Sequence, residues 1–342
     1  MFVIRPVQAR DLDGLLGLAG QTSFGLTTLP KDADWLAGRI RDSEEAFRRL
    51  RDQRPRGEAY LFVLDDTSTG RVLGTSGIVS KVGGFEPFWA YRIEASVHES
   101  KMLGLRKEIR TLHLEHEHDG PCEIVSMFLH PELRGRGLGR PLSLARFLFI
   151  AEHPWSFDER VIAEMRGVLD DSGRSEFWDA IGRHFFEIDY PKADYLSLLN
   201  KRFIADLMPR HPLYIPLLPP AAQAVIGRVH PETEPALAIL RQEGFAETGM
   251  VDIFEAGPIV GCPRDELRLV KESVTAEVTA ITDAPGASGD HLVGTRGAAF
   301  RACQTAVTRL PDGGVGLPEE AATALGIGVG DSVRFGHLRG WP

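Results

Sequence analysis

The spacing of apolar residues predicts alternating strands and helices in the first half of the chain. Apolar positions at helical spacing predict helices over residues 12–18, 34–51 and 142–150, with Asp11 as the cap of the first. Short apolar runs predict strands over residues 2–5, 60–64, 72–79, 89–93, 123–129 and 160–165. Because strands and helices are mixed in this order, we expect an α+β fold with a mixed sheet flanked by helices.

The stretch Arg-Gly-Arg-Gly-Leu-Gly at residues 134–139 lies between a predicted strand and a predicted helix. Glycines let the backbone come close to a ligand, and the N–H groups of the first helical turn face it. The arginines add positive charge where an anion would lie. The stretch therefore predicts a cradle for a pyrophosphate, although a surface turn with arginines for solubility is the alternative. Its spacing matches neither the P-loop nor the dinucleotide-binding fingerprint.

The order R-x-x-G-x-G between a strand and a helix resembles the acyl-CoA-binding motif of the GNAT superfamily of N-acetyltransferases. The resemblance implies a GNAT acetyltransferase-like sheet, in which loop amides hold the CoA pyrophosphate and the preceding strand holds the pantetheine arm. The loop residues that it assigns to CoA are Arg134, Gly135, Arg136, Gly137, Leu138 and Gly139.

Composition and charge exclude some classes of function. With 342 residues, two or more domains are expected, and 43% hydrophobic and 25% charged residues are ordinary for a soluble protein. The net charge of −9 argues against general nucleic-acid binding. Cys122, Cys262 and Cys303 have neither metal nor disulfide spacing. With no membrane-length apolar run and no signal-peptide pattern, a cytoplasmic protein that binds no membrane is expected.

The second half suggests a duplicated fold. The pattern predicts, in residues 175–186 and again in residues 235–245, a short helix followed by a strand that begins with an aromatic residue. Gly244 is expected to end the second of these helices. The alternative is that such junctions are simply common. Beyond residue 271, the predicted order of strand, helix, turn and strand over residues 315–335 resembles small swapped-hairpin barrels, which occur in DNA-binding proteins. Because this tail has few lysines and arginines, we expect a structural appendage or an oligomer contact instead. We therefore expect an acyl-CoA-binding domain at 1–195, a degenerate second half at 196–270 and a small β-rich segment at 271–342.

Five further stretches resemble arginine N-succinyltransferase. They are GLTTLP at 25–30, EMRG at 164–167, FIADLMP at 203–209, VIGRVHP at 225–231 and DIFEAGP at 252–258. The resemblance runs from residue 1 to about residue 258. It implies that succinyl passes from succinyl-CoA to the α-amine of L-arginine, with succinyl-CoA as co-substrate and no permanently bound cofactor. It also implies a homo-oligomer or a pairing with a related subunit, and leaves ornithine open as a second substrate.

The resemblance assigns two residues near the reaction. Met127 falls where the family contacts succinyl-CoA, through its backbone, although a plain core residue fits the pattern too. The family's proton donor falls on His230, ahead of Pro231; without the resemblance, such a histidine is more often structural.

The charges of the substrates require partners in the site. Glu164 and Arg166 are the candidates for arginine, with Asp252 and Glu255 as alternatives. The succinyl carboxylate needs a cation or an N–H group, for which Arg92 and Arg228 are candidates.

The histidines at 113, 116 and 118 invite a metal hypothesis, and the first two could share a helix face. No reaction step requires a metal, and Glu115 and Glu117 make the stretch a solvated charge run, so we expect no metal. Two other functions stay open: a weakly catalytic or CoA-sensing subunit of a paired enzyme, and an acetyl-CoA-dependent N-acetyltransferase.

Overall fold

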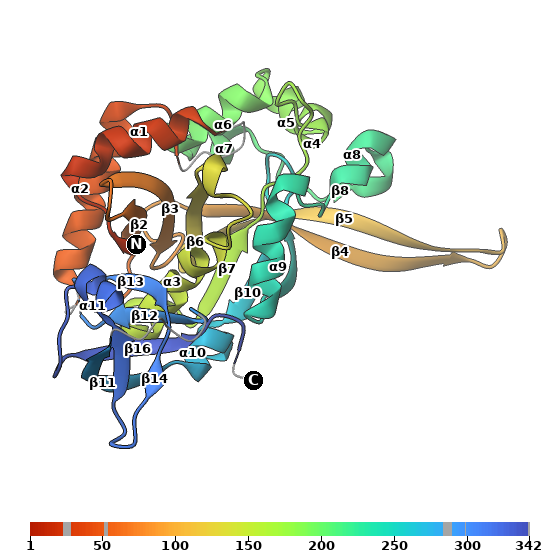
Figure 1. The fold of residues 1–342 in the computed structure, drawn as a ribbon. Helices are drawn as coiled ribbons and strands as arrows, with labels where there is room; N and C mark the ends of the chain where they lie inside the picture. The colour runs from red at the N-terminus through yellow and green to blue at the C-terminus, as the bar shows by residue number, and fades with distance from the viewer. Residues whose placement is uncertain (23–28, 51–53, 283–288, 298, 341–342) are drawn as a thin grey trace.

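A mixed sheet flanked by helices forms the centre of the molecule (Figure 1). The structure, a computed structural model, describes residues 1–22, 29–50, 54–282, 289–297 and 299–340. Within these residues, sixteen strands form the sheet in the order β14-β15-β11-β16-β12-β13-β1-β2-β3-β6-β7-β10-β9-β4-β5-β8. The predicted α+β class is confirmed.

The first half has the predicted succession of elements. They are β1 (Phe2–Pro6), α1 (Leu12–Gly20), α2 (Ala33–Arg49), β2 (Ala59–Asp66), β3 (Arg71–Val79), β6 (Cys122–Leu129), α3 (Gly139–Glu152) and β7 (Arg160–Glu164). Strands β1, β2, β3 and β6 pair antiparallel, and β7 runs parallel to β6. Asp11 is at the N-cap position of α1, as predicted, but its side chain does not cap the helix. Its carboxylate accepts two bonds from the Arg5 guanidinium instead, at 2.7 and 2.8 Å.

Helix α3 carries the glycine loop at its N-terminal end and lies in the middle of the molecule. It contacts β3 of the central sheet and also β12 and β16 of the C-terminal segment. Its residues from Pro141 to Ile150 are all buried. An apolar run without a polar face is the pattern of a helix covered on several sides.

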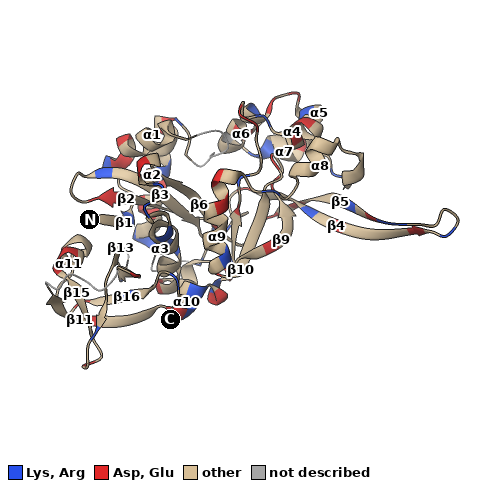
Figure 2. Cartoon of the chain, turned by 45° about the vertical axis from the view of Figure 1, so that its right-hand side comes forward, with Lys and Arg blue, Asp and Glu red and all other residues tan. Residues whose placement is uncertain are grey.

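Two insertions interrupt this succession. The first is a hairpin of β4 (Phe88–Ser100) and β5 (Leu105–Glu117), which projects far from the rest of the molecule (Figure 1 and Figure 2). The second consists of α4 (Glu176–Ala180), α5 (Gly182–Phe186), α6 (Tyr190–Leu199), α7 (Arg202–Leu207), β8 (Leu213–Tyr214) and α8 (Pro220–Val225). The expected strand start at the end of residues 175–186 is therefore wrong, since this segment forms two short helices.

Residues 234–263 complete the central sheet. They form α9 (Glu234–Gln242), β9 (Ala246–Val251) and β10 (Pro258–Pro263), and β10 pairs antiparallel with both β7 and β9. Gly244, with φ of +104°, follows α9 as predicted. The strands of the expected second half thus join the first sheet, and the described part of the chain contains no separate sheet for a duplicated fold. Where the domains begin and end stays a prediction.

The C-terminal segment extends the sheet on the other side. It follows α10 (Arg268–Glu272) and contains β11 (Val274–Thr282), β12 (His291–Thr295), β13 (Ala302–Thr305), β14 (Thr308–Arg309), β15 (Val315–Pro318), α11 (Glu319–Leu325) and β16 (Ser332–His337). Strand β13 joins β1 at the pair Ile4 and Ala302. The predicted order of strand, short helix, turn and strand over residues 315–335 is confirmed by β15, α11 and β16. None of the described helices has the length and apolar character needed to cross a membrane.

Candidate functional site

A cavity of about 1550 Å³ opens beside α3 and extends between β6 and β7. Its wall includes residues 123–129 on β6, most of the glycine loop, residues 163–166 on and after β7, and parts of α6 and α9. The end of the C-terminal segment, residues 337–339, also lines it. The cavity therefore joins three parts of the chain that are distant in sequence.

Strands β6 and β7 separate along the cavity. Their parallel pairing covers Cys122 with Val161 and Glu123 with Ile162, although β6 continues to Leu129. A register shift interrupts the pairing of β6 with β3, and Ser126 at this bulge has φ of +56°. The bulge and the separation leave a slot with unpaired backbone groups along one side. Such a slot suits an extended ligand that carries its own amides, as the pantetheine arm does.

The glycine loop has the backbone that a ligand cradle needs. Gly135 and Gly137 have φ of +77° and +81°, and no heavy atom would lie within 4 Å of an added Cβ at either position. The left-handed conformation, not lack of space, therefore favours glycine here, and the space above the loop is open. Of the six predicted loop residues, Arg134, Gly135, Gly137 and Gly139 line the cavity. Arg136 and Leu138 do not line it, and Leu138 packs against the main core.

Met127 lines the slot where the predicted thioester contact lies. It follows the bulge at Ser126 and is partly buried against the main core. Its side chain therefore packs on the core, and a contact of its backbone with succinyl-CoA stays a prediction.

Two carboxyl groups from neighbouring strands meet at the cavity. Glu123 of β6 and Glu164 of β7 share a hydrogen bond, and burial raises the pKa of Glu123 to about 7. Burial also raises the pKa of Glu164 well above its usual range, and the charges of Glu123 and Asp252 act in the same direction. Glu164 exposes more than a third of its surface, but it does so into the cavity, where protein surrounds it. Because the two carboxyls share a hydrogen bond, the protonation of one depends on that of the other.

Further acidic groups surround this pair. Burial raises the pKa of Asp194, on α6, to about 7, with the charge of Asp252 adding to the effect. Asp252 lines the cavity, and one of its carboxylate oxygens accepts from the backbone N–H groups of Phe254 and Glu255. Sequence reasoning missed Glu123 and Asp194 because their charges lie far apart along the chain.

Glu255, an alternative substrate residue, has a structural role. Its Oε1 accepts from the backbone N–H of Gly167 at 2.7 Å, and its Oε2 accepts from the Tyr190 hydroxyl at 2.6 Å. Both oxygens are therefore engaged in joining β7, α6 and the turn after β9.

Arg166 lines the cavity and lies next to the predicted proton donor. Its Nη1 is 3.6 Å from a carboxylate oxygen of Glu232, and its backbone carbonyl accepts from the His230 N–H at 2.8 Å. His230 does not itself line the cavity, but Glu232 and Thr233 do, so His230 lies at its edge. Burial and the positive charge of Arg166 lower the pKa of His230.

The ring of His230 has a defined orientation. Its Nδ1 accepts from the backbone N–H of Glu232 at 3.2 Å, at the start of a short 3₁₀ turn, Pro231–Thr233. Nε2 is therefore the ring nitrogen that this contact leaves for another partner. His130 repeats the same arrangement before the glycine loop, with Glu132 as the donor at 3.4 Å.

The cations expected for the succinyl carboxylate lie elsewhere. Arg92 is on the projecting hairpin and binds Glu115, and neither it nor Arg228 lines the cavity. Arg39 of α2 and Lys201 line it instead. Arg39 donates to the Ser126 hydroxyl at 3.1 Å, and burial lowers its pKa to about 10.

The histidines of β5 do not share a face as a helix would place them. His113 and His116 lie three positions apart on a strand, so their side chains point to opposite sides. Across the described ranges, no cluster of three or more His, Cys, Asp and Glu side chains is arranged to hold a metal.

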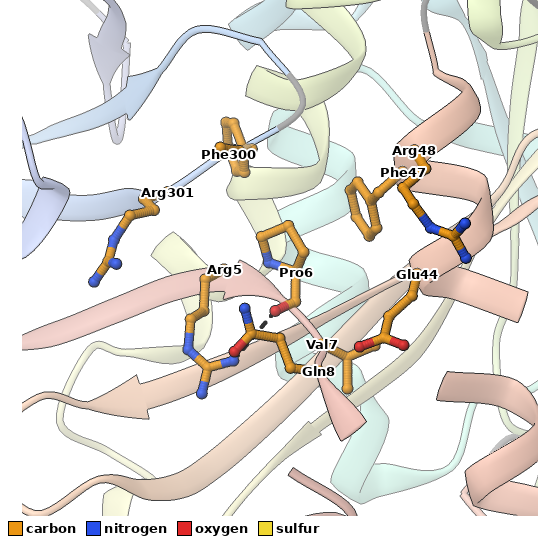
Figure 3. A pocket seen from close by; sticks show the side chains of 10 residues that line it. Arg5, Pro6, Val7, Gln8, Glu44, Phe47, Arg48, Phe300 and Arg301 are labelled. Atoms are coloured by element: carbon orange, nitrogen blue, oxygen red, sulfur yellow. Dashed lines mark hydrogen bonds between the residues drawn. The ribbon is translucent and has the colours of Figure 1, made fainter. Parts of the chain in front are cut away.

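A smaller cavity of about 490 Å³ lies between the end of β1, α2 and the C-terminal segment (Figure 3). None of the predicted site residues lines it. Arg5 at its wall is bound to Asp11 and Asp65, which leaves that guanidinium engaged within the protein.

Known proteins resemble this chain over nearly its whole length. Residues 2–269 match the family model of the arginine N-succinyltransferase beta subunit, and residues 274–336 match the model of its C-terminal domain. The arginine N-succinyltransferase of Yersinia enterocolitica is 44% identical over 339 residues, which are 98% of this chain and 97% of that protein. The arginine N-succinyltransferase subunit beta of Pseudomonas aeruginosa is 43% identical over 335 residues, 97% of each chain.

A solved structure has the same fold. The arginine/ornithine succinyltransferase subunit AI from Pseudomonas aeruginosa superimposes with a TM-score of 0.89 at 36% identity, covering 99% of both chains. Of the five stretches that carry the resemblance in the sequence, residues 25–28 lie outside the described residues.

Proposed function

The chain belongs to the arginine N-succinyltransferase family, and we propose that it transfers the succinyl group of succinyl-CoA to the α-amine of L-arginine. An acyltransferase of this kind uses a CoA thioester as its co-substrate. The observation that carries the proposal is a cavity that joins the glycine loop and the slot between β6 and β7 to a group of carboxyl side chains. The loop suits the pyrophosphate, the slot suits the pantetheine arm, and the carboxyl groups suit a cationic amino acid.

The amino-acid substrate brings two cations and one carboxylate. We assign the α-ammonium to the Glu123–Glu164 pair, because these carboxyls lie on the two strands that form the slot. Asp194 and Asp252 are left for the guanidinium, and the Arg166 guanidinium for the substrate carboxylate. Each assignment joins groups of opposite charge at a wall where water is partly excluded.

The chemistry needs three proton and electron movements. The ammonium gives one proton to the Glu123 carboxylate of the pair, whose pKa of about 7 suits a base at neutral pH. The amine nitrogen then bonds to the thioester carbon, and the carbon–sulfur bond breaks with its electron pair left on sulfur. His230 Nε2 donates the proton that sulfur needs, and the second proton, which the nitrogen releases as the amide forms, restores the one that His230 has given up. In total the ammonium loses two protons, one of which ends on CoA and one in solvent.

Purified protein mixed with succinyl-CoA and L-arginine is expected to release free CoA thiol and form N2-succinyl-L-arginine. Thiol titration and mass spectrometry follow the two products, and L-ornithine is measured in parallel. If CoA binds but no thiol is released, the chain is a CoA-sensing or weakly catalytic subunit. If acetyl-CoA reacts faster than succinyl-CoA, the proposed acyl group is wrong.

Arg39 is our candidate for the succinyl carboxylate, since it reaches the bulge at Ser126 beside the slot. Arg39→Leu is expected to lower kcat/KM for succinyl-CoA by roughly 10–100-fold, because it removes a charge-assisted contact. Activity with acetyl-CoA, which has no such carboxylate, is expected to change by less than about twofold, since the partner charge is absent.

The matched control is Arg41→Leu, an exposed arginine two residues further along α2. It removes the same charge from the same helix without touching the cavity. An equal loss with both acyl-CoA substrates in Arg39→Leu would show that Arg39 supports the site in general and does not select succinyl.

A further inference from the structure

The turn after β16 brings the C-terminal segment against the glycine loop. Leu338 is buried in the main core, and its N–H donates to the Asp290 carbonyl at 2.8 Å. Its own carbonyl accepts from Arg140 Nη1 at 3.3 Å, and Arg140 follows the last glycine of the loop. His337, Leu338 and Arg339 consequently line the same cavity as the loop glycines.

Two guanidinium groups meet at this turn. Burial and the positive charge of Arg339 lower the pKa of Arg140. Arg140 donates to the Leu338 carbonyl at 3.3 Å and to the Gln242 side-chain oxygen at 2.5 Å. Among the described residues, neither Arg140 nor Arg339 forms an ion pair with a carboxylate, whereas neighbouring Arg268 is bound to Glu243 and Glu272. Two like charges held together disfavour each other until an anion binds between them.

We propose that Arg339, together with Arg140, binds the 3′-phosphate of the CoA co-substrate. The proposal rests on the proposed function, because it takes the CoA pyrophosphate to lie on the glycine loop. In CoA the 3′-phosphate is attached to the ribose next to the pyrophosphate, so a ligand on the loop brings it to the adjoining wall. A phosphate monoester carries nearly two negative charges at neutral pH and accepts several bonds from guanidinium groups.

The rest of this wall is compatible with the adenosine end of the ligand. Asp290 and Gln304 line it beside the arginines. Carboxylate and amide oxygens accept from the exocyclic amine of adenine. The C-terminal segment thereby gains a role in binding, beyond that of an appendage.

Binding of CoA and of 3′-dephospho-CoA, measured by calorimetry on the full chain, tests this assignment. We expect the unmodified protein to bind CoA at least about tenfold more tightly, and Arg339→Ala to lose most of that preference. Affinity for 3′-dephospho-CoA is expected to stay within about twofold in the variant, because that ligand has no group for Arg339. Arg339→Glu is expected to favour 3′-dephospho-CoA.

Arg309→Ala serves as the control, because it removes one exposed arginine from the same segment outside the cavity. Equal affinity of the unmodified protein for the two ligands would overturn the proposal. So would an equal loss for both ligands in Arg339→Ala. Failure of the proposed function is distinct, since it would appear as no thiol release from succinyl-CoA with arginine.

Discussion

Replacing His230 by alanine is expected to lower kcat by roughly 100-fold or more, the usual effect of losing a positioned proton donor. KM for succinyl-CoA is expected to stay within about twofold, because His230 lies at the edge of the cavity and outside the CoA slot. Steady-state release of CoA thiol, measured against each substrate in turn, separates the two quantities.

The local structure around His230 calls for a second variant. Its Nδ1 accepts from the Glu232 N–H, so alanine removes a turn contact as well as a titratable ring. His230→Asn keeps an acceptor for that N–H but cannot exchange a proton, and we expect it to be as slow as alanine. His130→Asn makes the same change in the equivalent turn before the glycine loop and is expected to keep kcat near that of the unmodified protein.

The pH profile gives an independent measurement of the same role. Because burial and Arg166 lower the pKa of His230, its limb in the profile of kcat is expected below the ordinary value of 6.5. That limb is expected to vanish in His230→Asn. A normal kcat in His230→Ala removes the residue from the mechanism, and a normal kcat in His230→Asn reduces it to a turn contact.

Local signals in the sequence predict the glycine loop and the two elements that flank it well. The glycine loop depends on backbone conformations that only glycine adopts readily, and these conformations are a property of a few adjacent residues. Strand β6 and helix α3 on either side follow from apolar runs. The loop that we propose for the pyrophosphate can therefore be predicted from the sequence without knowledge of tertiary contacts.

The substrate side depends on contacts between distant parts of the chain. Glu123 and Glu164 meet because β6 and β7 are neighbours in the sheet, and Arg39 reaches the slot from α2. No spacing in the sequence marks these residues as one group. Arg92 has the expected charge but lies on a hairpin that leaves the molecule, where Glu115 binds it.

The same limit applies to the second half of the fold. A helix, a glycine and an aromatic strand start look alike whether they end a second domain or close the first sheet, and the pairing of β10 with β7 is a contact between distant segments. Strand β5 exposes most of its residues on both sides, so it lacks the alternating apolar pattern of a strand against a core. Helices α4 and α5, of five residues each, are too short for a periodic pattern.

Replacing Glu123 by glutamine is expected to lower kcat/KM for L-arginine by roughly 100-fold, because the pair loses the group that takes the ammonium proton. Glu164→Gln is expected to act similarly. KM for succinyl-CoA is expected to stay within about twofold in both, since CoA is assigned to the loop and the slot. Glu247→Gln, a largely exposed glutamate on β9, is the control and is expected to have no effect.

The pH dependence follows from the direction of the pKa shifts. Burial raises the pKa of Glu123 to about 7, so the pair takes up a proton as the pH falls below that value. A protonated pair neither attracts the ammonium nor accepts its proton, so kcat/KM for arginine is expected to rise with pH through about 7. In Glu123→Gln, Glu164 loses the repulsion of a neighbouring charge, and its pKa is expected to fall toward the ordinary value. The rise of kcat/KM for arginine in this variant is then expected at a lower pH than in the unmodified protein.

Stability in the absence of substrate provides a test of the same pair that does not depend on catalysis. A carboxyl with a raised pKa binds more protons in the folded than in the unfolded protein between its ordinary value of 4.5 and about 7. The free energy of unfolding is therefore expected to fall as the pH rises through this window, and Glu123→Gln is expected to flatten the decline. Denaturant titrations at pH 5 and pH 8 measure the difference. An unchanged decline in the variant, together with an unchanged pH profile for arginine, would mean that Glu123 titrates like an ordinary surface carboxylate and takes no part in the transfer.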